Sequence, residues 1–211
     1  MLTNQDIRSF HRAAVLASVD VVNGVRPEDL DRQTPCEGWN LSQLLAHMTV
    51  QHRGFAAAAR GDGADLARWD SATVADAVAT DPAGAYAGAV TDVLAAFSDD
   101  DVLAASFALP GFGPGAEFPG AQAIGFHFVD YVVHGWDVAR SIDAPFTLPD
   151  DVISAVLPLV FAVPDGDFRA APGSPFARAI EAGDGVSDLG RVLLHLGRSP
   201  AWTLSSLTTP A

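Results

Sequence analysis

The chain contains no lysine, and this absence removes several kinds of catalytic chemistry. All twelve fixed positive charges are arginines, against 26 aspartates and glutamates, and the formal net charge is -14 over 211 residues. A lysine Schiff base, a phosphate-loop lysine and a lysine general base are therefore excluded. The arginines are scattered along the sequence, which argues against nucleic-acid binding because phosphate neutralisation needs grouped cations.

Cysteine and long apolar runs are also scarce. Cys36 is the single cysteine, so no disulfide can form within the chain, and we expect a cytoplasmic protein. The N-terminus lacks the basic start and apolar run of a signal peptide, and no stretch reaches the roughly 20 apolar residues of a membrane span. We expect small-molecule partners, no nucleic acid and no membrane, while the oligomeric state stays open.

Apolar periodicity and helix-boundary residues predict an all-α fold. The expected helices cover about 3–23, 40–60, 82–97, 123–141, 149–162 and 190–197. Asn40 and Pro82 suit helix starts, and Gly24 suits a helix end. The Gly- and Pro-rich segment 105–120 predicts an irregular crossover with room for a short hairpin. We therefore expect a four-helix bundle over residues 1–145 and a short helical extension, 146–211, packed on it.

A polar stripe crosses the apolar segment 123–139. At about 100° per residue in a helix, His127, Asp130, His134 and Asp137 fall within roughly 80° of one another, while apolar residues cover the rest of the circumference. A helix that is apolar nearly all round is normally buried, and buried carboxylates and imidazoles need partners. A metal ion satisfies both types, and the alternative is the solvated edge of an amphipathic helix.

A metal site needs a third ligand from another helix besides Asp130 and His134, which are neighbours one turn apart. The helix at 40–60 offers His47 and His52. His52 lies nearer to the apolar stripe of that helix, so periodicity favours it, but spacing alone leaves both residues open.

Three sequence motifs carry a family resemblance. They are TPCEGWNLSQLLAHM at 34–48, DYVVHGWDVA at 130–139 and RVLLHLGRSPAW at 191–202. The first two resemble motifs of the actinobacterial, mycothiol-dependent maleylpyruvate isomerase-like proteins within the wider DinB-like metal-binding superfamily, and the third is similar to the ending of an uncharacterised branch. The resemblance implies a four-helix bundle with a divalent metal bound by His47, Asp130 and His134. The characterised isomerase type has Glu where this chain has Asp130, and this departure separates the chain from that type at a predicted ligand.

The resemblance also implies a reaction. Three protein ligands leave one position open, as in catalytic zinc sites, and the metal-bound species would be a water or a thiol. We expect a thiol-dependent isomerase or transferase that uses zinc, with nickel or iron as alternative metals, and mycothiol as cosubstrate. The alternatives are a non-catalytic metal-binding bundle, such as a sensor or storage protein, and a metal-free protein that binds a small molecule.

Several other residues are candidates for supporting roles. Asp137 could orient a ligating histidine or be a solvated charge, and the second interpretation is slightly favoured. His127 could be an alternative ligand or a proton shuttle. Cys36 lacks a base nearby in sequence, which favours a structural role over a nucleophilic one. His11 and His195 carry no partner motif and are expected to be packing or surface residues.

Overall fold

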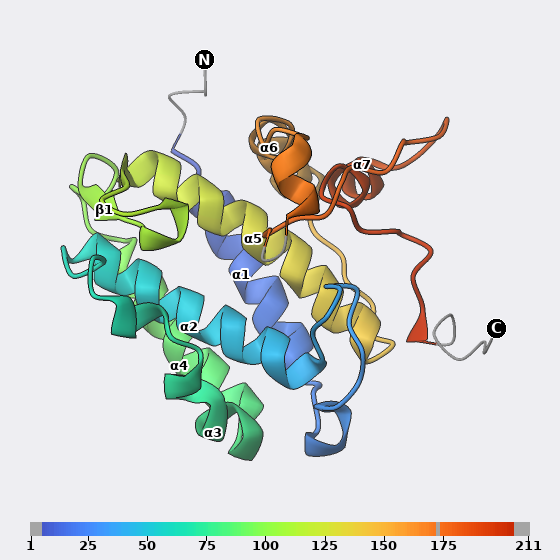
Figure 1. Ribbon diagram of the computed structural model, residues 1–211, viewed down its shortest axis with the longest axis horizontal. Helices are drawn as coiled ribbons and strands as arrows, with labels where there is room; N and C mark the ends of the chain where they lie inside the picture. Colours follow the sequence, from blue (N-terminus) through green and yellow to red (C-terminus); the bar gives the residue numbers. More distant parts are fainter. Residues whose placement is uncertain (1–5, 172–173, 205–211) are drawn as a thin grey trace.

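The computed structural model describes residues 6–171 and 174–204 (Figure 1). Its helices are α1 (Arg8–Val22), α2 (Leu41–Ala59), α3 (Ala72–Thr80), α4 (Pro82–Ala96), α5 (Gly120–Ser141), α6 (Asp150–Phe161) and α7 (Asp188–His195), and its strands are β1 (Ser106–Ala108) and β2 (Glu117–Pro119). Helix α1 packs against α4 and α5, and α2 packs against the same two helices. These four helices form the predicted bundle, so the all-α fold class is confirmed.

Local sequence signals account for where α2 and α4 begin. The Asn40 side chain accepts from the backbone N–H of Gln43, and the Gln43 side chain accepts in return from the N–H of Asn40. This reciprocal pair satisfies two of the free donors at a helix start. Pro82 occupies the first turn of α4, where its missing N–H is no loss, and the Asp81 carboxylate caps the N–H of Gly84.

Helix α3 was not predicted. Its sequence lies in a stretch interpreted as a Gly- and Asp-rich link, but Val74 and Val78 are four residues apart and fully buried. Helix α1 begins at Arg8, and the first three residues of the predicted helix, 3–5, lie outside the described residues. The crossover at 105–120 does contain a short hairpin, in which Phe107 of β1 pairs antiparallel with Phe118 of β2.

Helix α5 is the central element of the fold. It lies against α1, α2, α6 and the hairpin, and nearly all of its side chains are buried. His127, His134 and Asp137 of the polar stripe are buried and Asp130 is partly exposed, so the interpretation of the stripe as a solvated edge is wrong. Buried polar side chains in such a position need partners within the fold.

The C-terminal segment packs on one face of the bundle. Val152, Val156 and Val160 of α6 and Val192 of α7 share an apolar cluster with residues of α1 and α5. This cluster contains residues from both sides of residue 145, and the division of the chain there stays a prediction. Among the described residues, no helix combines the length and the apolar character that crossing a membrane requires.

Candidate metal centre

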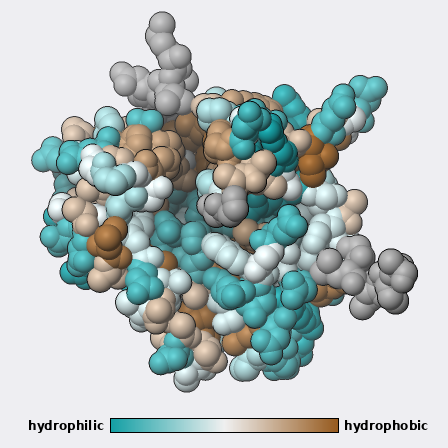
Figure 2. Space-filling view, viewed as in Figure 1, coloured by the Kyte–Doolittle hydropathy of each residue, from teal (hydrophilic) through white to brown (hydrophobic). Residues whose placement is uncertain are grey.

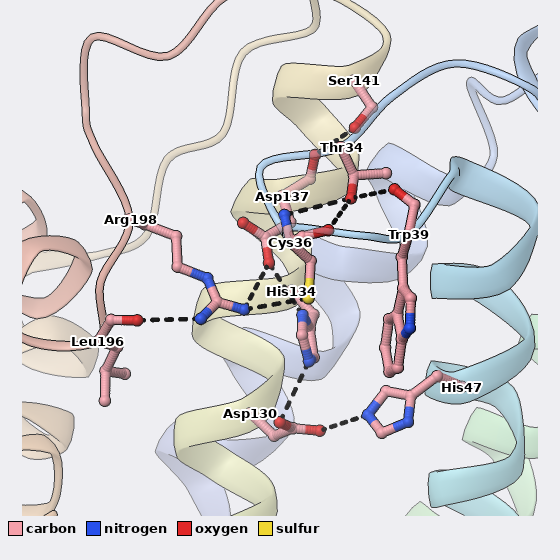
Figure 3. Close-up of polar contacts among 10 residues, drawn as sticks. All are labelled: Thr34, Cys36, Trp39, His47, Asp130, His134, Asp137, Ser141, Leu196 and Arg198. Carbon is pink, nitrogen blue, oxygen red and sulfur yellow. Dashed lines mark hydrogen bonds and ion pairs between the residues drawn. The ribbon is translucent and has the colours of Figure 1, made fainter. Parts of the chain in front are cut away.

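The side chains of His47, Asp130 and His134 converge between α2 and α5 (Figure 3). One donor atom from each lies within 4.8 Å of the others. Nε2 of His134 is 3.4 Å from Oδ1 of Asp130, and Nε2 of His47 is 3.8 Å from Oδ2 of the same carboxylate. Two imidazoles and one carboxylate are a donor set that suits zinc and related divalent metals.

The three side chains differ in their exposure. His47 and Asp130 are 26% and 23% exposed, whereas His134 is 4% exposed. Trp39, from the loop before α2, packs its ring 4.7 Å from that of His47. The centre is thus enclosed on the α5 side and reachable from solvent on the other. On the face shown in Figure 2, hydrophilic residues gather in a central hollow between α2 and the α6–α7 segment.

The electrostatics of the centre favour a cation. Burial lowers the pKa of His47 to about 4, so its imidazole is neutral and offers a lone pair. Burial also lowers the pKa of His134, but Asp130 and Asp137 outweigh that effect and raise it to about 10. Burial raises the pKa of Asp130, and His134, His47 and Arg198 together bring it below its usual value. A proton on His134 therefore occupies the place that a metal ion would take.

Asp137 contacts the ring nitrogen of His134 that does not face Asp130. Its Oδ2 atom lies 2.9 Å from Nδ1 of His134, and its side chain is fully buried. The interpretation of Asp137 as a solvated charge is wrong. A carboxylate that accepts the Nδ1 proton leaves the Nε2 lone pair of the neutral imidazole facing Asp130, an arrangement common in metal sites.

Cys36 and Arg198 lie on the same side of His134 as Asp137 (Figure 3). Nη2 of Arg198 is 3.3 Å from Sγ of Cys36 and 3.4 Å from Oδ2 of Asp137. Donor atoms of Cys36, His134 and Asp137 also lie within 4.8 Å of one another. The guanidinium between the thiol and the carboxylate disfavours a second cation there, so the first group of three fits a metal better.

The structure separates the two histidines of α2. His52 is fully buried, as its periodicity predicted, but it contacts His127 and lies away from the convergence point. His127 is likewise fully buried and bonded to histidines on both sides. The structure thus brings His47, rather than His52 or His127, to Asp130 and His134. Their role as ligands stays a prediction.

Two residues near the centre or the stripe were not recognised from the sequence. Arg198 comes from the loop after α7, and no spacing rule links it to α5. His11 was expected to be a packing or surface residue, and it is buried, as a packing residue is. Its hydrogen bond to His127 is the part that the sequence did not reveal. The position of His127 on the polar stripe could have predicted a partner such as His11, because a buried imidazole needs partners for both of its nitrogens.

Comparison with known proteins identifies the family. Residues 11–139 match the family described as the mycothiol maleylpyruvate isomerase N-terminal domain. Two uncharacterised proteins of Mycobacterium tuberculosis, from strains CDC 1551 / Oshkosh and ATCC 25618 / H37Rv, are each 26% identical over 168 residues, which is 79% of this chain and 84% of theirs.

Solved structures share the fold. The crystal structure of the mycothiol-dependent maleylpyruvate isomerase superposes with a TM-score of 0.64 at 16% identity, and that of a mutant of the isomerase with 0.65 at 14%. Each match covers 91% of this chain and 88% of the other. The family match spans more than half of the sequence and includes both motifs that line the candidate centre. The chain belongs to the mycothiol maleylpyruvate isomerase N-terminal domain family.

Proposed function

We propose that the protein is a thiol-dependent isomerase or transferase that acts at a divalent-metal site formed by His47, Asp130 and His134. The convergence of these three donors within 4.8 Å is the observation that carries the proposal. Family membership supports the thiol, because the solved relatives are mycothiol-dependent isomerases. Mycothiol is the cosubstrate we propose, and zinc is the metal.

The residues present fit such a metal. His47 supplies a neutral imidazole, Asp130 a carboxylate, and His134 an imidazole whose Nδ1 proton is held by Asp137. Asp130 has one methylene fewer than a glutamate, so its carboxylate would hold the ion nearer to α5. When bound, the metal would lower the pKa of a thiol or polarise a carbonyl.

The proposed reaction is thiol addition, rotation and thiol elimination beside His47 and Asp130. The edge formed by His47 and Asp130 is partly exposed, and a thiol and a substrate would approach from this side. Thiol addition to an electrophilic double bond forms a carbon–sulfur bond and turns the double bond into a rotatable single bond. After rotation, the carbon–sulfur bond breaks and the double bond forms again in the other geometry. The thiol is regenerated, and no oxidant or reductant is consumed.

Metal analysis and turnover test this proposal together. We expect purified protein to bind one equivalent of zinc, and the His134→Ala variant to lose it, because two ligands cannot hold the ion as three do. His195→Ala is the control, since His195 lies on α7 and contacts the carbonyl of Val163. Zinc-loaded protein should then convert an electrophilic cis-alkene in the presence of mycothiol. Turnover that is equally fast without metal or without thiol would contradict the proposal.

A further inference from the structure

Three buried imidazoles form a continuous chain beside the candidate metal centre. Nε2 of His11 on α1 lies 2.8 Å from Nδ1 of His127 on α5, and Nε2 of His127 lies 3.1 Å from Nδ1 of His52 on α2. At most 1% of each residue is exposed. Burial lowers the pKa of His11 to about 3 and lowers those of the other two well below their usual value. All three rings are therefore neutral at physiological pH.

The outer end of this chain lies just beneath the protein surface. His11 is 1% exposed and lines a groove of about 250 Å³ between α1 and the end of α4, together with Arg8, Arg12, Leu94 and Phe97. The groove is open to solvent, so a water in it is the group with which a proton relay through these rings requires His11 to exchange a proton.

The inner end of the chain, at His52, lies next to the candidate metal centre. On α5, His127 precedes Asp130 by three residues, a rise of about 4.5 Å along the helix axis. Tyr131 stacks on both His52 and His127, with ring centroids 3.9 and 4.2 Å away. The negative charge of Asp130 also acts on His52, opposing the effect of burial on its pKa. His52 and His127 thus neighbour the candidate metal centre along α2 and α5, the two helices that also carry His47, Asp130 and His134.

Two polar atoms at this inner end lack partners. Nε2 of His52 and Oγ1 of Thr49 are buried and have no hydrogen-bond partner among the described residues. They belong to residues three apart on α2, which face the same side of the helix. Buried polar groups without protein partners are commonly bridged by an ordered water.

We propose that His52, His127 and His11 form a proton relay between the candidate metal centre and the groove beside α1, with a water at Thr49 completing its inner end. The catalytic purpose of the relay rests on the proposed function. A thiol that becomes a nucleophile must release its proton. Once thiol and substrate cover the exposed edge of His47 and Asp130, the three imidazoles offer an inner route for that proton.

The transfer balances at every ring. A proton that arrives at Nε2 of His52 releases the proton on Nδ1 of His52 to Nε2 of His127. Nδ1 of His127 then passes its proton to Nε2 of His11, and Nδ1 of His11 gives one to water in the groove. Each ring begins and ends neutral with one proton. When the thiol leaves and recovers its proton, the same transfers run backwards and reset the three tautomers.

Exchange of the ring protons with deuterium tests the relay without any metal or thiol. In the full chain labelled with 15N-histidine, the relay allows the ring N–H groups of His52 and His127 to exchange without local unfolding. The His11→Phe variant keeps a ring against Phe97 but removes the outer nitrogen, and should slow this exchange about tenfold or more. His195→Phe is the matched control and should leave it unchanged. Equal or faster exchange in His11→Phe would overturn the relay, since destabilisation alone accelerates exchange.

A second measurement tests the connection to the metal centre. Zinc-loaded protein is mixed with mycothiol in weak buffer, and proton release is followed with a pH indicator. Thr49→Val should slow release about tenfold or more, within the range that positioned proton transfer contributes, while thiol affinity stays constant. Unchanged release in Thr49→Val would overturn this connection. Failure of the wild-type protein to bind mycothiol would instead contradict the proposed function, and the exchange result would still decide whether the relay exists.

Discussion

Nδ1 of His134 and Oδ2 of Asp137 lie 2.9 Å apart inside the protein, on two consecutive turns of α5. This contact determines which nitrogen of His134 is available to a metal. With the Nδ1 proton held by Asp137, the lone pair of the neutral ring is on Nε2, which lies 3.4 Å from Asp130. The orientation of the proposed ligand therefore depends on a residue that does not reach the metal itself.

The first prediction concerns Asp137→Asn. The amide keeps the shape of the carboxylate but loses its charge, so it binds the Nδ1 proton more weakly. We expect zinc affinity to fall about 10- to 100-fold, as for other residues that orient metal ligands. Isothermal titration calorimetry with zinc measures the change. Asp92→Asn, which alters an exposed carboxylate paired with Arg60, should have no effect, and equal affinities in the two variants would contradict the role of Asp137.

The second prediction concerns stability at acid pH. His11, His52 and His127 have lowered pKa values in the folded protein because they are buried. As the pH falls below about 6.5, the unfolded chain binds protons that the folded chain does not, so the folded state loses stability. Each group contributes up to about 1.4 kcal/mol per pH unit. Urea unfolding of the metal-free protein should give a lower free energy at pH 5 than at pH 7, with a smaller difference in His11→Phe. The same difference in both proteins would exclude this cause.

The third prediction concerns Arg169, whose guanidinium is fully buried. It donates hydrogen bonds to the carbonyls of Val163, Pro164, Ala177 and His195 and so holds the segment after α6 against the end of α7. A lysine cannot reach all of these acceptors, and each hydrogen bond to a charged group that is lost costs about 1.5–3 kcal/mol.

Chemical unfolding of Arg169→Lys should therefore show a loss of at least about 2 kcal/mol. Arg178→Lys is the matched control. It changes an exposed arginine that pairs with an exposed aspartate, Asp167, and should stay within about 0.5 kcal/mol of the wild type. A loss of similar size in the two variants would contradict the buried role of Arg169.

The fourth prediction compares two helical glycines. A Cβ atom at Gly54 of α2 would lie 2.4 Å from the ring of Trp69, whereas a Cβ at Gly88 of α4 would meet nothing within 4 Å. We expect Gly88→Ala to stabilise the protein by about 0.5–1 kcal/mol, because alanine is the better helix former. Gly54→Ala should destabilise it by about 1–3 kcal/mol through overpacking. Thermal unfolding distinguishes the two, and a stabilising Gly54→Ala would show that Trp69 moves freely.

The sequence by itself determined every helix except α3, and it identified the family. Periodicity and capping residues such as Asn40 and Pro82 act over a few neighbours, so they could be interpreted without the fold. The same is true of Asp130 and His134, whose proximity follows from a spacing of four on one helix. The choice between His47 and His52 could not be made from periodicity. Both lie on α2 and the apolar pattern favours His52, whereas His47 is the one that lies beside Asp130 and His134.

Only the tertiary structure decided which polar groups meet. His11 and His127 are 116 residues apart, and Arg198 and Asp137 are 61 residues apart. These contacts arise from how α1, α5 and the loop after α7 pack, and no local pattern encodes that packing. Helix α3 was missed for a related reason, since Val74 and Val78 become a buried face only when α2 and α4 cover them. Local propensity determines the elements, whereas burial of side chains distant in sequence determines the partners within the site.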